Sequence, residues 1–176
     1  MIRFLIKVRL FDLLIGDWDR HAEQWGWVIQ KSDRGNVATP VAGDRDNAFF
    51  YISGLIPSII TNKNVEPLVR PFEKEIDHMP GLVYPFDRYF LSNTSEDMFI
   101  KQAKELQKSL SDEIIANAFE AWPEQIRKLN EKEIAEKLKS RREKLQEYAT
   151  QFFQQIQEQG KLSEALKGSE DLELSF

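Results

Sequence analysis

Apolar residues crowd the first fifteen positions of the chain and recur on more than one face of a helix. They are Ile2, Leu5, Ile6, Val8, Leu10, Phe11, Leu13, Leu14 and Ile15. Because a helix that is apolar on several faces has no side to give to solvent, the pattern predicts a buried helix over residues 2–15. Gly16 follows at the position where a left-handed glycine commonly ends a helix.

A period of two replaces the helical period after residue 24, and this change predicts a β-hairpin. The segments WGWVIQ and VATPVA both alternate, and a turn sequence with Gly and Asn lies between them. We expect strands over residues 24–30 and 37–43, joined by a turn over 31–36. Because proline cannot donate a ladder hydrogen bond, Pro40 places the second strand at an edge or at a bulge.

The segment from residue 53 to 93 holds five of the seven prolines and predicts a long irregular excursion with at most one short helix. From Thr94 onward the pattern is helical. Candidate helix starts are Thr94, Ser95, Asp112, Pro123 and Asn130, the last with Glu133 as a capping-box partner. The final helix is expected to run from about Glu131 to Gln159, a length of about 40 Å.

Together these elements predict an α+β fold that is mostly helical. Residues 1–159 form the domain, in which 1–52 hold the first helix, the acidic loop and the hairpin, 53–93 the irregular segment and 94–159 the C-terminal helices. Residues 160–176 form a tail or linker. We expect both Trp25 and Trp27 to belong to the core rather than to a ligand-stacking surface.

Composition narrows the function classes. A net charge of -5 argues against a nucleic-acid binder, which usually carries a basic face. The absence of cysteine excludes disulfides and thiolate metal sites. Four charged residues interrupt the apolar start too often for a signal peptide or a membrane span, namely Arg3, Lys7, Arg9 and Asp12. On this chain alone we expect a cytoplasmic protein without membrane insertion, or a cell-envelope location if the chain belongs to a larger surface protein.

Acidic residues flank the predicted hairpin at both open ends. Asp17 and Asp19 precede the first strand, and Asp44 and Asp46 follow the second. Because an antiparallel hairpin brings its two open ends together, the four carboxylates are expected to converge. Gln24 adds an amide five positions after Asp19.

This inventory suits metal-dependent phosphoryl transfer. One carboxylate orients the attacking hydroxyl, while other carboxylates and an amide hold a divalent metal against the phosphate oxygens. Oxygen ligands favour Mg²⁺ or Mn²⁺ over zinc. Arg20 and Arg45 can balance the negative charge or simply pair with the acids. The plainer alternative stays open, since Asp and Arg near turns more often cap helices and form ion pairs than catalyse. His21 can equally brace the loop.

The segments IGDWDRHAEQWGWV and VAGDRDNAFF resemble the catalytic centre of atypical protein-kinase-like enzymes. The closest patterns are those of the CotH spore-coat kinases, the secretory-pathway casein kinases of the Golgi and the type II phosphatidylinositol 4-kinases, with HipA-like kinases more distant. A similar kinase-like segment recurs in large Bacteroidetes surface or outer-membrane proteins. These families share an N-x-D-R/G-H type loop, a strand pair and a D-x-x-x-x-F metal motif. The match covers about Arg9 to Phe50.

The resemblance implies roles for the acidic loop and for the residues after the hairpin. Asp19 takes the place of the catalytic-loop aspartate, and Arg20 and His21 complete that motif. Gln24 takes the place of the asparagine or glutamate that binds the metal and its nucleotide.

The metal ligands implied by the resemblance come mainly from the second segment. Asp44, five residues before Phe49, takes the place of the metal-binding aspartate, and Asp46 is a second ligand. Asp17 stands where the relatives often have asparagine and is a further candidate ligand. The implied cofactors are ATP and Mg²⁺ or Mn²⁺, and the phosphate acceptor is unknown.

The sequence departs from this pattern in its first residues. A nucleotide lobe with a glycine-rich loop and a phosphate-binding lysine would precede the catalytic loop, which here begins some sixteen residues after Met1. We therefore expect the C-terminal lobe of such an enzyme, with a missing N-terminal lobe or a second copy as partner. The alternatives are a non-catalytic interaction or oligomerisation module and a metal-dependent phosphoesterase.

Overall fold

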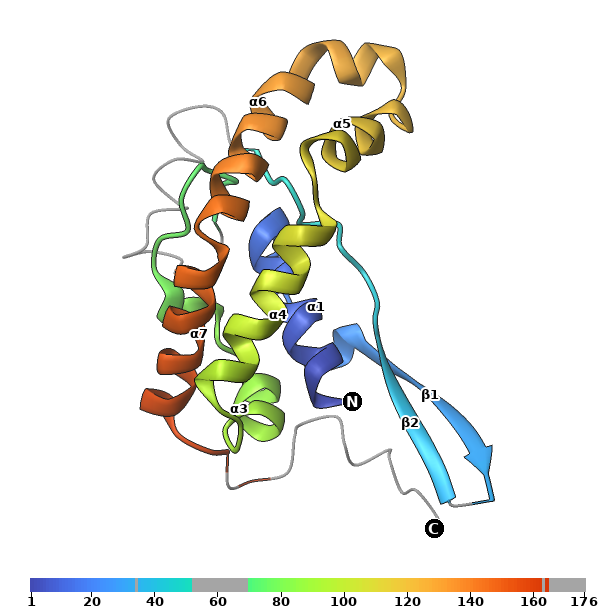
Figure 1. Cartoon of the computed structure of the whole chain (residues 1–176), viewed down its shortest axis with the longest axis vertical. Coiled ribbons are helices and arrows are strands. Elements are labelled where there is room, and N and C mark those ends of the chain that lie inside the picture. Colours follow the sequence, from blue (N-terminus) through green and yellow to red (C-terminus); the bar gives the residue numbers. More distant parts are fainter. Residues whose placement is uncertain (34, 52–69, 163, 165–176) are drawn as a thin grey trace.

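The computed structural model describes residues 1–33, 35–51, 70–162 and 164. Six α-helices and one two-stranded antiparallel sheet lie within these residues (Figure 1). The α+β, mostly helical fold class is therefore confirmed. Residue 52, residues 53–69 of the expected irregular segment, and most of the expected tail lie outside the described residues.

Helix α1 (Ile2–Ile15) is the buried first helix that the apolar pattern predicts. It packs against α4 (Glu96–Ser109), and α4 packs against α7 (Leu145–Gln159). Gly16 ends α1 with a left-handed φ of 73°. A Cβ at this position would lie 2.8 Å from Cδ2 of Phe72, so the site excludes larger residues as well.

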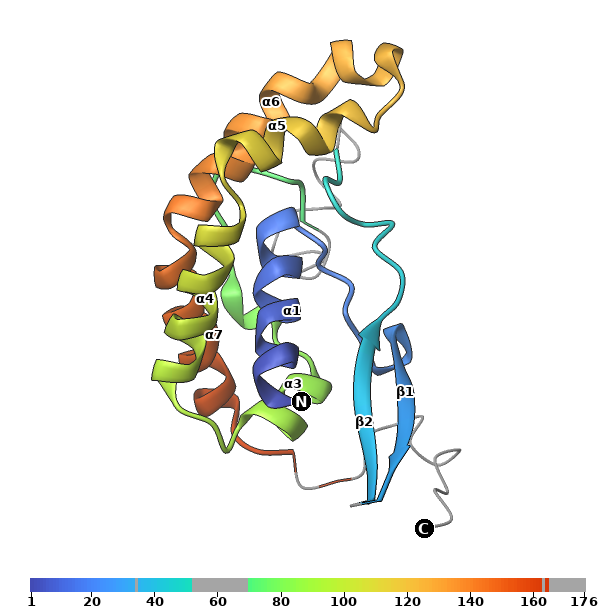
Figure 2. The same ribbon diagram turned by 45° about the vertical axis from the view of Figure 1, so that its right-hand side comes forward.

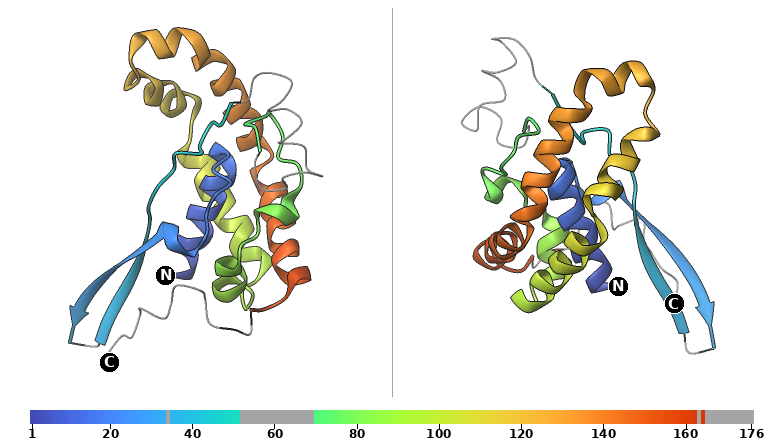
Figure 3. Two further views of the ribbon diagram at one scale, coloured as in Figure 1. Left: turned by 180° about the vertical axis from the view of Figure 1, so that it is seen from behind. Right: turned by 45° about the horizontal axis from the view of Figure 1, so that its top comes forward.

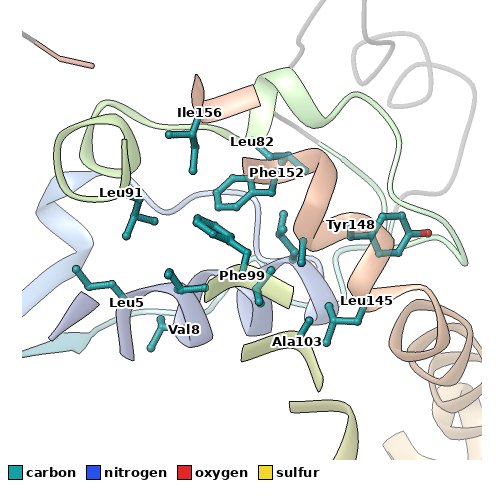
Figure 4. Packing of buried hydrophobic residues seen from close by; sticks show 14 of the residues in the cluster. Leu5, Val8, Leu82, Leu91, Phe99, Ala103, Leu145, Tyr148, Phe152 and Ile156 are labelled. Carbon is teal, nitrogen blue, oxygen red and sulfur yellow. The ribbon is translucent and has the colours of Figure 1, made fainter. Parts of the chain in front are cut away.

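The main core lies between α1, α4 and α7 (Figure 4). Its fully buried side chains include Leu5, Leu10, Leu91, Phe99, Ala103, Leu145, Phe152 and Ile156. Helices α4 and α7 thus supply partners for the apolar faces of the first helix. None of the helices in the described part of the chain is both long enough and apolar enough to cross a membrane.

The predicted hairpin is confirmed, with strands longer than expected. Strand β1 (Trp25–Ser32) pairs with β2 (Gly35–Ala42), so the turn is shorter than the predicted 31–36. Both strands are edges of a two-stranded sheet, which accommodates Pro40. The hairpin extends beside the helices and its turn points away from them (Figures 1 and 2).

The two tryptophans of β1 attach the hairpin to α3 (Pro85–Leu91). Trp25 is buried and stacks on Phe86, with ring centroids 4.5 Å apart. Trp27 lies 5.7 Å from the ring of Phe90. Both are core contacts, as expected. Helix α3 is also the short helix predicted in the proline-rich segment, and a single 3₁₀ turn, η2 (Met79–Leu82), precedes it.

The C-terminal half corrects the predicted single long helix. Lys144 separates α6 (Glu124–Glu143) from α7, and its φ and ψ of -90° and 5° are not helical. The side-chain amide of Gln107 donates to the carbonyls of Arg142 and Glu143, at 2.6 and 3.2 Å. This amide from α4 satisfies carbonyls at the break, a partner that the helical pattern of residues 131–159 does not reveal.

Two predicted helix starts were also wrong. Asn130 lies inside α6, which begins directly after Pro123, so the Asn130–Glu133 capping box does not form. Helix α5 (Asp112–Glu120) is capped by Ser111, whose hydroxyl accepts from the Ile114 amide at 3.2 Å, and not by Asp112. Helices α5 and α6 form a helical hairpin at one end of the molecule (Figure 3).

Candidate active site

Two polar segments meet at the open end of the β-hairpin. The loop from residue 16 to 24 enters β1, and the loop from 43 to 50 leaves β2. The Gly43 amide donates to the Gln24 carbonyl at 2.8 Å, and the Gly43 carbonyl accepts from Nη1 of Arg20 at 2.6 Å. The antiparallel ladder therefore brings the two acid-bearing segments side by side.

Arg20 holds this junction together from inside the protein. Its side chain is fully buried, and all three guanidinium nitrogens donate hydrogen bonds. Nε lies 2.9 Å from Oδ2 of Asp12 and Nη2 lies 3.3 Å from Oδ1 of the same carboxylate. Nη2 also donates to Asp17. One arginine thus connects helix α1, the loop before β1 and the loop after β2.

Asp12 is the centre of a larger ionic network. Besides Arg20, it accepts from Nη1 of Arg9 at 3.3 Å and from Nε of Arg45 at 3.2 Å. Arg9 in turn forms a bidentate pair with Asp87 of α3, at 2.8 and 3.1 Å. Arg9, Asp12 and Asp87 are buried. Three arginines and three aspartates balance in charge, and the hydrogen bonds offset their desolvation.

Burial shifts the titration of several groups in the network. It raises the pKa of Asp17 to about 6, against the opposing effect of Arg20. It also raises the pKa of Asp87, again opposed by its arginine partner, Arg9. The pKa of the Tyr84 phenol rises to about 12, first through burial and then through the nearby Asp19 carboxylate.

Asp19 is the aspartate of the first loop that remains partly open to solvent. Its side chain is 30 % exposed, and its Oδ1 lies 3.9 Å from Nε2 of His21. The Tyr84 hydroxyl, which donates to the Trp18 carbonyl at 2.9 Å, lies 3.5 Å from the same oxygen. The braced loop therefore presents Asp19, whereas its neighbour Arg20 points inward.

Asp44 and Asp46 are exposed on the second loop. The Asp46 amide donates to Oδ1 of Asp44 at 3.1 Å, and Nδ2 of Asn47 donates to Oδ1 of Asp46 at 3.1 Å. Asp44 has a φ of 21°, which is uncommon outside glycine. Gln24 is half-buried and joins the site through its backbone carbonyl.

A three-acid metal cluster is not formed in the described residues. No group of three or more His, Cys, Asp or Glu side chains there is arranged to hold a metal ion. The Asp17 carboxylate is buried and paired with Arg20, so it is not presented to a solvent cation. The accessible aspartates of the two loops are Asp19, Asp44 and Asp46.

The sequence reasoning missed the three charged groups that support these loops. Arg9 and Asp12 served only to exclude a membrane span, and Asp87 received no role. A signal was present, because Arg9 and Asp12 are three residues apart in a helix predicted to be buried on several faces. Opposite charges at that spacing can pair, and a buried helix requires such pairing.

Comparisons with protein-family models, with curated proteins and with solved structures found no match to this chain. The assignment of a function therefore rests on the residues of the two loops and on their geometry.

Proposed function

We propose that the chain is the catalytic, C-terminal lobe of an atypical kinase-like phosphotransferase. The reaction would transfer phosphate from ATP, with Mg²⁺ or Mn²⁺, to an acceptor whose identity is open. The observation that carries this proposal is the position of Arg20. Its guanidinium joins Asp12, Asp17 and the Gly43 carbonyl, so the two acid-bearing loops form one braced site.

Three features support Asp19 as the base for the attacking hydroxyl. Its side chain is partly exposed, and the loop that carries it is held in place by the buried Arg20. Asp19 has no arginine or lysine partner among the ion pairs of the described residues. A carboxylate without a cationic partner is free to accept a proton or to orient a hydroxyl group. The His21 imidazole lies beside Asp19 and can take part in the proton transfer or orient the acceptor.

Asp44 and Asp46 fit a hard divalent cation. Mg²⁺ is commonly held by one or two carboxylates together with substrate phosphate oxygens, rather than by a protein cage. Two exposed carboxylates on one loop suit that need, although the described residues form no three-acid cluster. The half-buried Gln24 is a further oxygen donor, and Asp17 is left out because Arg20 occupies it. A bound cation would neutralise the phosphate charge.

The nucleotide-binding half would come from a partner. The strands in the described residues are β1 and β2 alone, and both belong to the hairpin. In the kinase-like pattern the nucleotide phosphates are covered by a separate glycine-rich lobe. We propose that another segment or another chain supplies that lobe, and that this chain supplies Asp19 and the metal-binding acids.

Titration with Mn²⁺ tests the metal assignment, with free ion measured by electron paramagnetic resonance. We expect one weak site that is lost when Asp44→Asn and Asp46→Asn are combined, because both carboxylates contribute oxygens. Asp33→Asn is the matched control, since Asp33 is an exposed aspartate at the hairpin turn. Equal Mn²⁺ affinity in the double variant and in the control contradicts the assignment.

One observation favours a second candidate, a non-catalytic interaction module. In the register of the hairpin, Val28, Val37 and Val41 lie on the same face, and each is between 44 and 52 % exposed. Exposed apolar patches of this kind are common at protein interfaces.

A metal-dependent phosphoesterase would use the same acids with water as nucleophile, and its turnover would not depend on a nucleotide.

A further inference from the structure

We propose that Asp12 is a positioning residue for the acids of both loops, and that it acts on Asp44 and Asp46 through Arg45. The role of those two acids as cation ligands rests on the proposed function. The tether between Asp12 and Arg45 itself rests only on the geometry of the described residues.

Asp12 lies in the last turn of α1 with no exposed surface. Its Oδ1 accepts from Nε of Arg45 at 3.2 Å and from Nη2 of Arg20 at 3.3 Å. Its Oδ2 accepts from Nε of Arg20 at 2.9 Å. One rigid carboxylate therefore receives an arginine from each loop, and the relative position of the loops is set at this point.

The second loop is held at three places along its length, once by Arg20 of the first loop and twice by α1. Arg20 holds the Gly43 carbonyl at 2.6 Å, Asp12 holds Arg45, and the Phe49 amide donates to the Ile15 carbonyl at 3.0 Å. Arg45 also lies over the ring of Phe11, 5.6 Å from its centroid.

The inward orientation of Arg45 also affects the orientation of its sequence neighbours, Asp44 and Asp46. Its side chain turns inward onto Asp12 and Phe11 and is 34 % exposed, whereas Asp44 and Asp46 on either side are exposed. If this inward contact is lost, the peptide that carries both acids keeps only its anchors at Gly43 and Phe49.

The direction in which cation affinity changes when Arg45 is removed distinguishes a positioning role from a purely electrostatic one. Arg45 is a cation in sequence between two acids, so its removal would strengthen cation binding if only Coulomb repulsion mattered. A positioning role predicts the reverse, because the freed loop must lose conformational entropy when the cation binds. A fall in affinity after removal of a positive charge therefore reports orientation.

The test compares Mn²⁺ affinity in the wild type, Arg45→Gln, Arg45→Lys and the control Arg127→Gln. Arg127 forms an exposed pair with Glu131 on α6. We expect about tenfold weaker binding in Arg45→Gln, partial recovery in Arg45→Lys and no change in the control. Equal or tighter binding in Arg45→Gln would overturn the proposal. Arg45 is varied because loss of Asp12 would leave Arg9 and Arg20 short of a buried partner.

Amide hydrogen exchange on the same variants tests the tether without a metal. We expect faster exchange over residues 43–50 in Arg45→Gln, with α4 unchanged. Unchanged exchange over that segment overturns the tether, even if Mn²⁺ binds. If the wild type binds no Mn²⁺ but the segment exchanges faster in the variant, the proposed function and the effect on cation binding both fail while the tether stands.

Discussion

A single buried residue, Arg20, holds the two acid-bearing loops together. The resemblance to kinase-like loops predicts a catalytic motif that includes Arg20 beside Asp19, yet the Arg20 guanidinium is buried and donates to Asp12, Asp17 and the Gly43 carbonyl. Loss of one partner from such a buried network costs about 3–5 kcal/mol, because the charges that remain are uncompensated. Asp19, one position earlier, is 30 % exposed and is therefore the carboxylate of that predicted motif that solvent reaches.

The raised pKa of Asp17 predicts a pH-dependent contribution to stability. Burial raises the pKa from 3.8 to about 6, so between these values the folded state keeps a proton that the unfolded state has lost. The contribution of Asp17 to the free energy of unfolding therefore falls as the pH rises from about 4 to 6, and it levels above pH 6.

Urea unfolding of the wild type and of Asp17→Asn across pH 4–7 measures this contribution. We expect the free energy of unfolding of the wild type, minus that of Asp17→Asn, to decrease as the pH rises through this range. Asp87, whose pKa is also raised, is present in both proteins and cancels in the comparison to a first approximation. A difference that is constant or increases with pH contradicts the assignment to Asp17.

At the scale of elements, the sequence predicts what depends on local pattern. Helix α1, the Gly16 cap and the hairpin were predicted because periodicity, a positive-φ glycine and alternation are local signals. The break at Lys144 was not, since the Gln107 amide that satisfies its carbonyls comes from another helix. The pairing of Asp12 with Arg45 was not predicted either, because the two residues lie thirty-three positions apart in the sequence.

The exposed valine face of the hairpin carries a prediction of its own. If it is an interface between copies of the chain, light scattering at micromolar concentration will show a dimer, and Val37→Lys will return it to a monomer. A charge at this position would be desolvated in an interface, and so would oppose association. Val37 is 52 % exposed in the isolated chain, so the substitution leaves the fold intact. A wild-type monomer at that concentration argues against the interaction module.

At the scale of the whole molecule, the buried ionic network joins the helical body to the hairpin. Arg9 connects α1 with α3 through Asp87, and Asp12 connects α1 with both loops. The hairpin alone predicts from the sequence that the two loops converge. The sequence does not predict which acids remain accessible, because that depends on which of them pair with the arginines. Asp17 is occupied, whereas Asp19, Asp44 and Asp46 remain accessible.

The central claim is that Asp19 takes part in phosphoryl transfer. Incubation of the chain, together with the lobe that we propose covers the nucleotide, with Mn²⁺ and ATP labelled at the γ-phosphate measures it, as label transferred to protein and as released phosphate. We predict transfer that depends on ATP and falls about 10²–10⁴-fold in Asp19→Asn, the usual contribution of a positioned base. The control variant Asp33→Asn should retain the wild-type rate. No transfer by the wild type, or equal rates in Asp19→Asn and the control, would contradict the account.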